Sequence, residues 1–167
     1  FDGALVVDAL SLFFAFIVGS VATLVVVASY DYISEEDHLA EFYSLVILAA
    51  TGMTLMASAN SLVTVFVALE LASLPSYALV AFLKTNKGSV EAGLKYFLIG
   101  ALSSAVMAYG ISLIYATTGT LLLDDIASAV TGTELGGVLG LGIVMLAGGF
   151  AFKTASVPFH FWAPEAY

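Results

Sequence analysis

The sequence predicts an all-α, polytopic membrane protein. Hydrophobic residues make up 61% of its 167 residues and charged residues only 10%, and the mean hydropathy is +1.07. A soluble domain is closer to half apolar and a quarter charged, so this composition is suited to a lipid bilayer. The apolar runs are also about 20 residues long and do not alternate, which favours spanning helices over the strands of a membrane β-barrel.

Five stretches are long and apolar enough to be spanning helices. We expect them at about 5–29, 42–59, 61–83, 92–117 and 135–157. The connection TGTLLLDDIASAVTGTE contains a short amphipathic piece that we expect at the membrane interface. The last residues, VPFHFWAPEAY, hold two prolines and an aromatic cluster, which predicts a broken or re-entrant segment. The whole chain, 1–167, is expected to be a single membrane domain.

Small residues are dense in the last two expected helices, among them Gly100, Gly110, Gly142, Gly148 and Gly149. In lipid, helices associate through close backbone approach, which small residues allow. We therefore interpret these positions as packing surfaces.

Composition also excludes several classes of function. The absence of cysteine excludes a disulfide framework and a thiolate metal site. A net charge of −9 argues against nucleic acid as a partner. The sequence has no phosphate-binding glycine loop, metal-ligand cluster or nucleophile–base pair, so we expect no metal, cofactor or redox chemistry in this chain. It begins at Phe1 without a basic region, which does not fit a signal peptide and suggests a partial chain.

The lysines indicate an orientation. Lys84, Lys87 and Lys95, three of the four lysines, lie at or beside one polar loop. Because lysine bias marks the cytoplasmic side of a membrane, we expect the 84–91 loop on that side. The third helix would then run from outside to inside.

Glu70 lies in the apolar run FVALELASLPSYALVAF, about 14 Å along its expected helix and therefore near mid-membrane. A charge there costs at least about 2.5–3.5 kcal/mol. Ser73 and Tyr77 share its helical face, and Pro75 frees the carbonyl of Leu71 beside it. This polar stripe suits ion or proton handling. The alternative is a structural acid paired with a lysine on another helix.

Lys153 repeats this pattern, with Ser156 and His160 at the same spacings and Pro158 five residues later, which would free the carbonyl of Thr154. An ammonium group that is partly buried is poorly solvated, so such a lysine is suited to proton exchange. The alternative is a lysine that snorkels from a helix end. His160 itself has the chemistry of a proton relay, or it is a hydrogen-bonded packing residue among aromatic side chains.

Lys95 lies near the start of its expected helix, four residues after Glu91. That spacing and order favour an ion pair on the helix surface. From the residues alone, an interfacial pair is the preferred interpretation.

Three segments carry a family resemblance. They are LELASLPSYALVAF, SVEAGLKYFLIGALSSAVMAYGISLIYATTG and GFAFKTASVPFHFWAPEAY. In this order they resemble the antiporter-like subunit N of respiratory complex I, which has counterparts in archaeal F420H2 dehydrogenases. By this resemblance Glu70 is the glutamate of the family's fifth helix, and Lys95 and Lys153 are the lysines of the sixth helix and the broken seventh helix. His160 is the histidine close after that break, and the resemblance gives Lys95 a functional role.

The resemblance implies a proton-translocating subunit of a complex I-like NADH or F420H2:quinone oxidoreductase in the cytoplasmic membrane of a prokaryote. Glu70 near Lys95 or Lys153 would set the charge state of the lysine. NADH or F420H2, flavin, Fe–S clusters and quinone would be bound elsewhere in the complex, and the partners would be other membrane subunits and the lipid bilayer. The family is built on two inverted repeats, so we expect this chain to hold most of the first repeat. A sodium/proton antiporter subunit and a structural scaffold subunit remain alternatives.

Overall fold

The computed structural model describes residues 3–131 and 136–167, and these contain helices and no β-strand. The all-α class is therefore confirmed. Phe1 and Leu135, the expected start of the fifth helix, lie outside the described residues. The described helices are α1 (Ala9–Tyr32), α2 (Leu39–Ala57), α3 (Leu62–Val80), α4 (Lys87–Thr118), α5 (Leu123–Thr131), α6 (Gly137–Lys153) and α7 (Ala163–Ala166).

Four of these helices, α1 to α4, are long and apolar enough to cross a membrane. The fifth predicted span corresponds to α6, which is apolar but only 17 residues long and ends at Lys153 instead of residue 157. The amphipathic piece predicted in the connection before it is α5, with Asp124 and Asp125 in its first turn. Negative side chains are favourable there because the helix N-terminus carries partial positive charge.

Helix caps explain two boundaries that differ from the prediction. The first helix was expected from residue 5, but Asp8 caps α1 by accepting a hydrogen bond from the Ser11 N–H at 2.7 Å. The fourth was expected from residue 92, but the Asn86 side chain accepts from the Gly88 N–H at 2.9 Å and starts α4 at Lys87. Much of the polar 84–91 segment therefore belongs to the first turns of α4, because a capping side chain satisfies N–H groups that the helix cannot.

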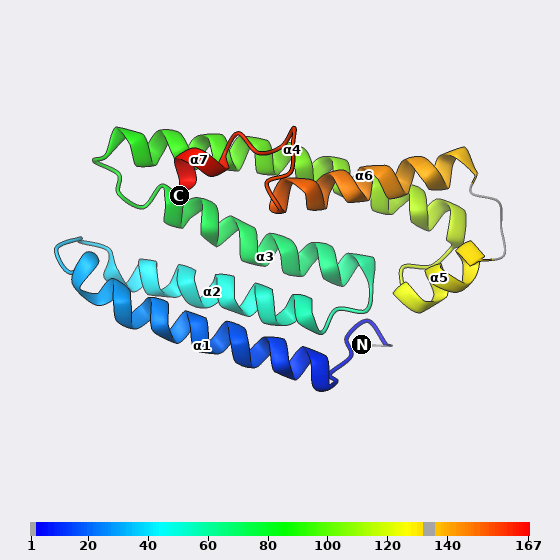
Figure 1. Ribbon diagram of the computed structural model, residues 1–167, viewed down its shortest axis with the longest axis horizontal. Helices are drawn as coiled ribbons and strands as arrows, with labels where there is room; N and C mark the ends of the chain where they lie inside the picture. Colours follow the sequence, from blue (N-terminus) through cyan, green and yellow to red (C-terminus); the bar gives the residue numbers. More distant parts are fainter. Residues whose placement is uncertain (1–2, 132–135) are drawn as a thin grey trace.

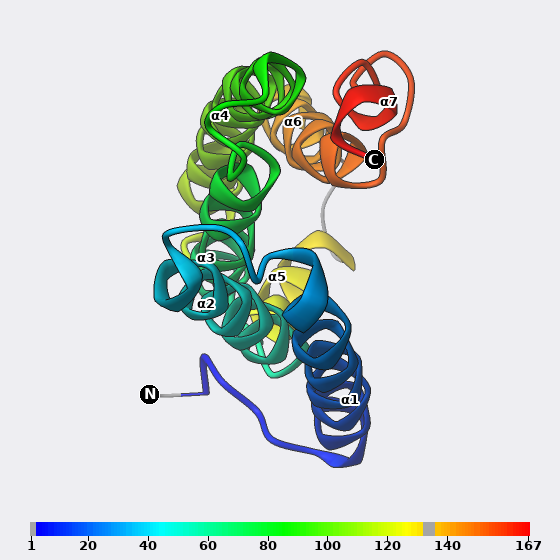
Figure 2. The ribbon, with the colours of Figure 1, turned by 90° about the vertical axis from the view of Figure 1, so that its left-hand side faces the viewer.

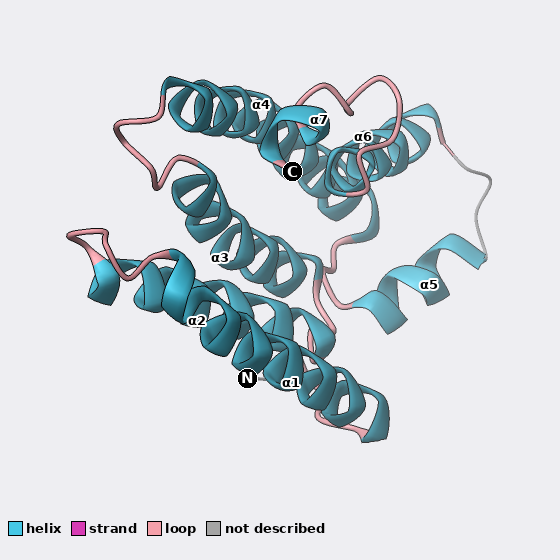
Figure 3. Cartoon of the chain, turned by 60° about the vertical axis from the view of Figure 1, so that its left-hand side comes forward, coloured by secondary structure: helices cyan, strands magenta, loops and turns pink. Residues whose placement is uncertain are grey.

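The helices form a curved row in the order α1, α2, α3, α4, α6, as Figure 1 and the nearly end-on view in Figure 2 show. Contacts join α1 to α2, α2 to α3, α3 to α4 and α4 to α6, and α7 also packs on α4. Figure 3 shows α5 beyond one end of α3, where Ile126 and Val130 of this helix pack against a core cluster formed by α3, α4 and α6. Many large apolar side chains of α1, such as Phe13 and Phe16, are exposed. Such surfaces suit lipid or neighbouring helices.

Glycines set how closely these helices approach. A Cβ atom on Gly52 of α2 would overlap the backbone of α3 and lie 2.8 Å from the Ala68 carbonyl oxygen. Gly110 of α4 meets the backbone of α6 in the same way, 2.8 Å from the Leu146 nitrogen. The packing interpretation is confirmed for Gly100, Gly110, Gly142 and Gly149, whereas a Cβ on Gly136, Gly137, Gly140 or Gly148 would meet open space.

We predict that Gly52→Ala lowers the free energy of unfolding by about 1–3 kcal/mol, because the added methyl group pushes α3 backbone away. The measurement is thermal unfolding of the purified protein in detergent. Gly19→Ala in α1 is the control, because a Cβ there meets nothing within 4 Å; it should be neutral or stabilise by up to about 1 kcal/mol through helix propensity. Equal stability of the two variants would contradict close α2–α3 contact.

Candidate functional site

Glu70 lies in the middle of α3 and its half-buried side chain faces α4. The Ser104 hydroxyl of α4 donates a hydrogen bond to the Glu70 carboxylate at 2.5 Å. A hydrogen bond to a carboxylate is among the stronger ones in proteins. The acid is therefore held at a helix–helix contact and does not face an open surface.

The predicted stripe beside Glu70 is present but differs in one respect. Ser73 and Tyr77 are both buried on α3, and Ser73 donates to the Leu69 carbonyl of its own helix. Pro75 is buried within α3, yet the helix continues through it to Val80. The proline therefore does not end the helix, and because it has no N–H it cannot donate to the Leu71 carbonyl, as its place in the sequence had suggested.

Lys153 is the last residue of α6, and aromatic rings surround its ammonium group. Its Nζ atom lies 5.5, 5.6 and 5.7 Å from the ring centroids of Tyr77, Tyr96 and Phe152. At such distances the electron-rich ring faces attract a cation. These three residues pack with Trp162, and we call the four together the aromatic cluster.

The carboxylate of Glu70 acts on Lys153 from farther away than a contact ion pair would. Among residues 3–131 and 136–167, no carboxylate oxygen lies within 4.0 Å of its Nζ atom, but Glu70 interacts with it electrostatically. Glu70 belongs to α3 and Lys153 to α6, and these two helices are joined through α4. The two charges therefore influence each other without forming a contact ion pair.

The predicted face formed by Lys153, Ser156 and His160 is wrong, because α6 ends at Lys153. After this residue the backbone turns: the Ser156 N–H donates to the Ala151 carbonyl at 2.8 Å. Ser156 is exposed, with its hydroxyl 2.8 Å from that of Thr154. Pro158 is also exposed and follows the end of the helix, so it frees no carbonyl within a continuing helix. The predicted break is present, but it lies before the proline.

His160 is half-buried and stacks on Phe161 with ring centroids 4.6 Å apart. Its Nδ1 atom is buried and has no hydrogen-bond partner in the part of the chain that the structure describes. The interpretation of His160 as a hydrogen-bonded packing residue is therefore not supported for this nitrogen.

Lys95 forms the ion pair with Glu91 that its spacing predicted, at 2.7 Å. It also forms one that the sequence did not predict: Glu165 of α7 lies 2.7 Å from the same Nζ atom. Two carboxylates thus share the Lys95 ammonium. Glu70 is not one of them, so of the two lysines considered as partners of Glu70, Lys95 forms its ion pairs with other carboxylates.

Two serines of α4, Ser103 and Ser104, have roles that the sequence did not indicate. They point from α4 to different neighbours: Ser103 donates to the Gly149 carbonyl of α6 at 3.4 Å, and Ser104 donates to Glu70 of α3. Tyr96, Phe152 and Trp162 were likewise not singled out. The aromatic richness of the final segment was a signal for Trp162, whereas Tyr96 and Phe152 lie inside α4 and α6. Within the described ranges, no three His, Asp or Glu side chains form a group that could hold a metal ion.

We predict that Ser104→Ala lowers the free energy of unfolding by about 1–3 kcal/mol, because the carboxylate of Glu70 loses its donor inside the bundle. Thermal unfolding in detergent measures it. Ser112→Ala is the matched control, since Ser112 is an exposed serine of the same helix that donates only to the Tyr109 carbonyl. We expect Ser112→Ala to change stability by no more than about 0.5 kcal/mol. Equal effects would show that the bond to Glu70 contributes nothing.

Comparison with known proteins places this chain in a family. Residues 59–167 match the family model described as NADH:quinone oxidoreductase/Mrp antiporter, TM. The chain is 46% identical over its whole length to F420H2 dehydrogenase subunit N of Methanosarcina mazei, and covers 34% of that protein. It is 41% identical to NADH-quinone oxidoreductase subunit N of Desulforamulus reducens, with 99% of this chain and 35% of the relative aligned.

Two solved structures share the fold. A chain of respiratory complex I from Thermus thermophilus matches with a TM-score of 0.79 and 38% identity, over 99% of this chain and 35% of that chain. A chain of the archaeal membrane-bound sulfane sulfur reductase matches with a TM-score of 0.85 and 26% identity, over 95% of this chain and 32% of that chain. The chain spans about a third of the length of the curated relatives named above. With most of its residues matched by the family model, it belongs to the NADH:quinone oxidoreductase/Mrp antiporter transmembrane family, and it resembles the subunits N of that family.

Proposed function

We propose that this chain is part of a proton-translocating membrane subunit of a complex I-like NADH or F420H2:quinone oxidoreductase. The observation that carries the proposal is the arrangement of Glu70 and Lys153. They are opposite charges on two helices that both pack on α4, with Glu70 bound by Ser104 and Lys153 facing three aromatic rings. The subunit N relatives support the type of complex.

The chemistry is a coupled titration. Aromatic faces and the field of Glu70 favour the Lys153 ammonium, and no carboxylate among the described residues touches it. When the negative charge of Glu70 is neutralised or compensated by another cation, the lysine holds its proton less firmly and releases it. A pair in direct contact would resist such a change more strongly, because its Coulomb attraction is larger at short distance.

Lys95 and His160 are proposed as further stations on the proton path. Lys95 is shared by Glu91 and Glu165, so its proton depends on two carboxylates. His160 follows the end of α6 and has an unpartnered buried Nδ1 atom. Ser73, Tyr77 and the residues of the broken segment, Pro158 and Ser156 included, are proposed to line the path or shape its backbone.

In the assembled complex this chain would be a non-redox component of a translocase and would catalyse no reaction alone. NADH or F420H2, flavin, Fe–S clusters and quinone would be bound by other subunits. Its partners would be neighbouring membrane subunits and lipid. We propose that it forms one membrane domain in the cytoplasmic membrane of a prokaryote, with the 84–91 segment on the cytoplasmic side. Lys84 and Lys87, both exposed, support that orientation.

Glu70→Gln tests the proposal directly. The amide has the shape of the carboxylate and can still accept the Ser104 hydrogen bond, but it has no charge. We expect the complex to assemble and proton movement coupled to electron transfer to fall strongly. Reconstituted vesicles with a pH-sensitive dye report the proton-to-electron ratio, and an unchanged ratio would remove Glu70 from the mechanism.

Lys153→Ala should reduce proton pumping more than Lys84→Ala or Lys87→Ala. Lys153 lies within the aromatic cluster, whereas Lys84 and Lys87 are exposed at the end of the bundle. The same vesicle measurement applies to all three variants. If the three pump equally well, Lys153 is a snorkelling residue and has no role in proton transfer.

Two other functions would give different results in these experiments. The family model itself includes Mrp antiporters, so a sodium/proton antiporter subunit is the second candidate. Transport that requires sodium ions in the vesicle experiment would favour it. A structural scaffold is the third, and there Glu70→Gln would prevent assembly instead of uncoupling an assembled complex.

A further inference from the structure

We propose that Glu165 is a positioning residue for Lys153, because its ion pair with Lys95 holds the segment after α6 against α4 and keeps the aromatic cluster closed around the Lys153 ammonium. This positioning is a matter of geometry within the chain. Its relevance to proton transfer rests on the proposed function.

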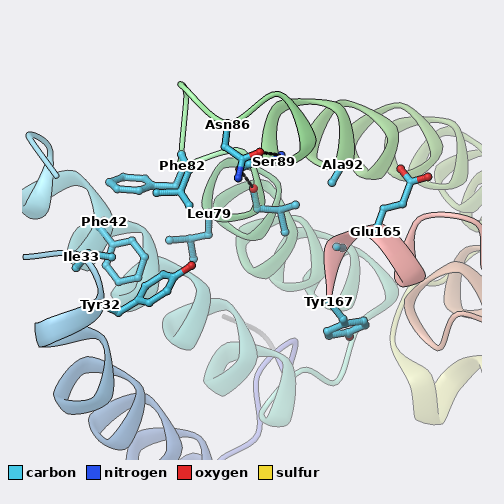
Figure 4. A pocket seen from close by; sticks show the side chains of 13 residues that line it. Tyr32, Ile33, Phe42, Leu79, Phe82, Asn86, Ser89, Ala92, Glu165 and Tyr167 are labelled. Carbon is cyan, nitrogen blue, oxygen red and sulfur yellow. Dashed lines mark hydrogen bonds between the residues drawn. The ribbon is translucent and has the colours of Figure 1, made fainter. Parts of the chain in front are cut away.

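Glu165 links α7 to α4. Both carboxylate oxygens of Glu165 approach the Lys95 Nζ atom, at 2.7 and 2.8 Å. These residues are far apart in sequence, and Figure 4 shows the Glu165 side chain directed from α7 toward α4. The bridge therefore attaches a helix of only four residues to a helix of 32.

A second contact lies beside this bridge. Tyr96, next to Lys95 in the chain, stacks on Trp162, with ring centroids 4.2 Å apart and planes inclined by 13°. Trp162 directly precedes α7, so the ion pair and the stack fasten the same short segment to successive residues of α4. The side chains of Lys95 and Glu165 are 42% and 44% exposed. An ion pair this exposed contributes little stability by itself. We therefore infer that the ion pair and the ring stack together hold the segment against α4.

Trp162 connects this segment to the surroundings of Lys153. The Trp162 indole N–H donates to the Phe152 carbonyl at 3.3 Å, beside the last residue of α6. The same carbonyl also accepts the Ala155 N–H at 3.0 Å, so Trp162 is a further donor that ties its segment to the end of α6. Tyr96 and Phe152 are two of the three rings that face the Lys153 ammonium. Moving Trp162 away would therefore disturb both rings at once.

There is room for such a movement. A cavity of about 540 Å³ lies beside α7 and is bordered by Glu165, Ala166 and Tyr167 on one side and by Leu79, Asn86 and Ser89 on another. Figure 4 shows the side chains of Leu79, Asn86, Ser89, Glu165 and Tyr167 around it. Once the ion pair is lost, α7 can shift toward this space without meeting a packed core.

Glu91 provides a matched control. It contacts the same Lys95 ammonium at 2.7 Å, but it lies on α4 itself and fastens no second segment. Glu91→Gln and Glu165→Gln each remove one carboxylate from Lys95. Only Glu165→Gln removes the link to α7.

The experiment measures the reactivity of Lys153 in the intact complex. Detergent-purified complex is treated briefly with acetic anhydride, and acetylation of each lysine is measured by mass spectrometry of its peptides. We expect Lys153 to be acetylated about fivefold faster in Glu165→Gln than in the wild type, as its enclosure loosens. Glu91→Gln should match the wild type, and Glu165→Asp, which keeps the carboxylate, should restore most of the protection.

Equal acetylation of Lys153 in the wild type and Glu165→Gln would overturn the inference, and so would an equal rise in Glu91→Gln. Should Glu165→Gln fail to assemble, Trp162→Phe carries the test, because it keeps an aromatic ring and loses only the donor to Phe152. Faster acetylation of Lys153 in that variant supports the inference and an unchanged rate contradicts it. Since acetylation is measured without electron transfer, failure of the proposed function would appear only in the vesicle assay with Lys153→Ala.

Discussion

The packing of α4 against both α3 and α6 is the constraint on which the rest of the site depends. Glycines bring the backbones together: Gly110 meets α6, and a Cβ on Gly100 would overlap the Tyr77 side chain of α3. Because α4 is so close to both neighbours, Ser104 reaches Glu70 on one side and Ser103 reaches α6 on the other. A larger residue at these contacts would separate the helices that bring Glu70 and Lys153 within electrostatic range.

The two lysines of the site are stabilised in different ways. Lys95 has two carboxylates in direct contact, so its positive charge is more than compensated locally. Lys153 has aromatic faces around it and a carboxylate that acts from a distance. Cation–π attraction stabilises the ammonium less than a contact ion pair in the same surroundings would. Lys153 is therefore the more responsive of the two to a change of charge nearby.

The segment after α6 gives these lysines a physical connection. Its turn ends the helix at Lys153, Trp162 binds the helix end, and Glu165 reaches Lys95. Residues of α7 and of the irregular segment before it thus complete the surroundings of a charge inside the bundle. Pro158 was expected to interrupt a continuing helix, but α6 has already ended at Lys153. The contacts at that helix end are made by Trp162 and by backbone N–H groups.

The sequence by itself determined the all-helical membrane class, the four long apolar helices, the place of Glu70 within α3 and the Lys95–Glu91 pair. All of these follow from hydropathy and helical spacing, which are local properties of the chain. Only the tertiary structure decided that Ser104 binds Glu70, that Lys153 lies among aromatic rings and that Glu165 reaches Lys95. The expected Lys153–Ser156–His160 face failed because helical spacing has no meaning beyond the end of a helix. Contacts between α3, α4, α6 and α7 depend on how helices distant in sequence align, and no spacing within one segment encodes that alignment.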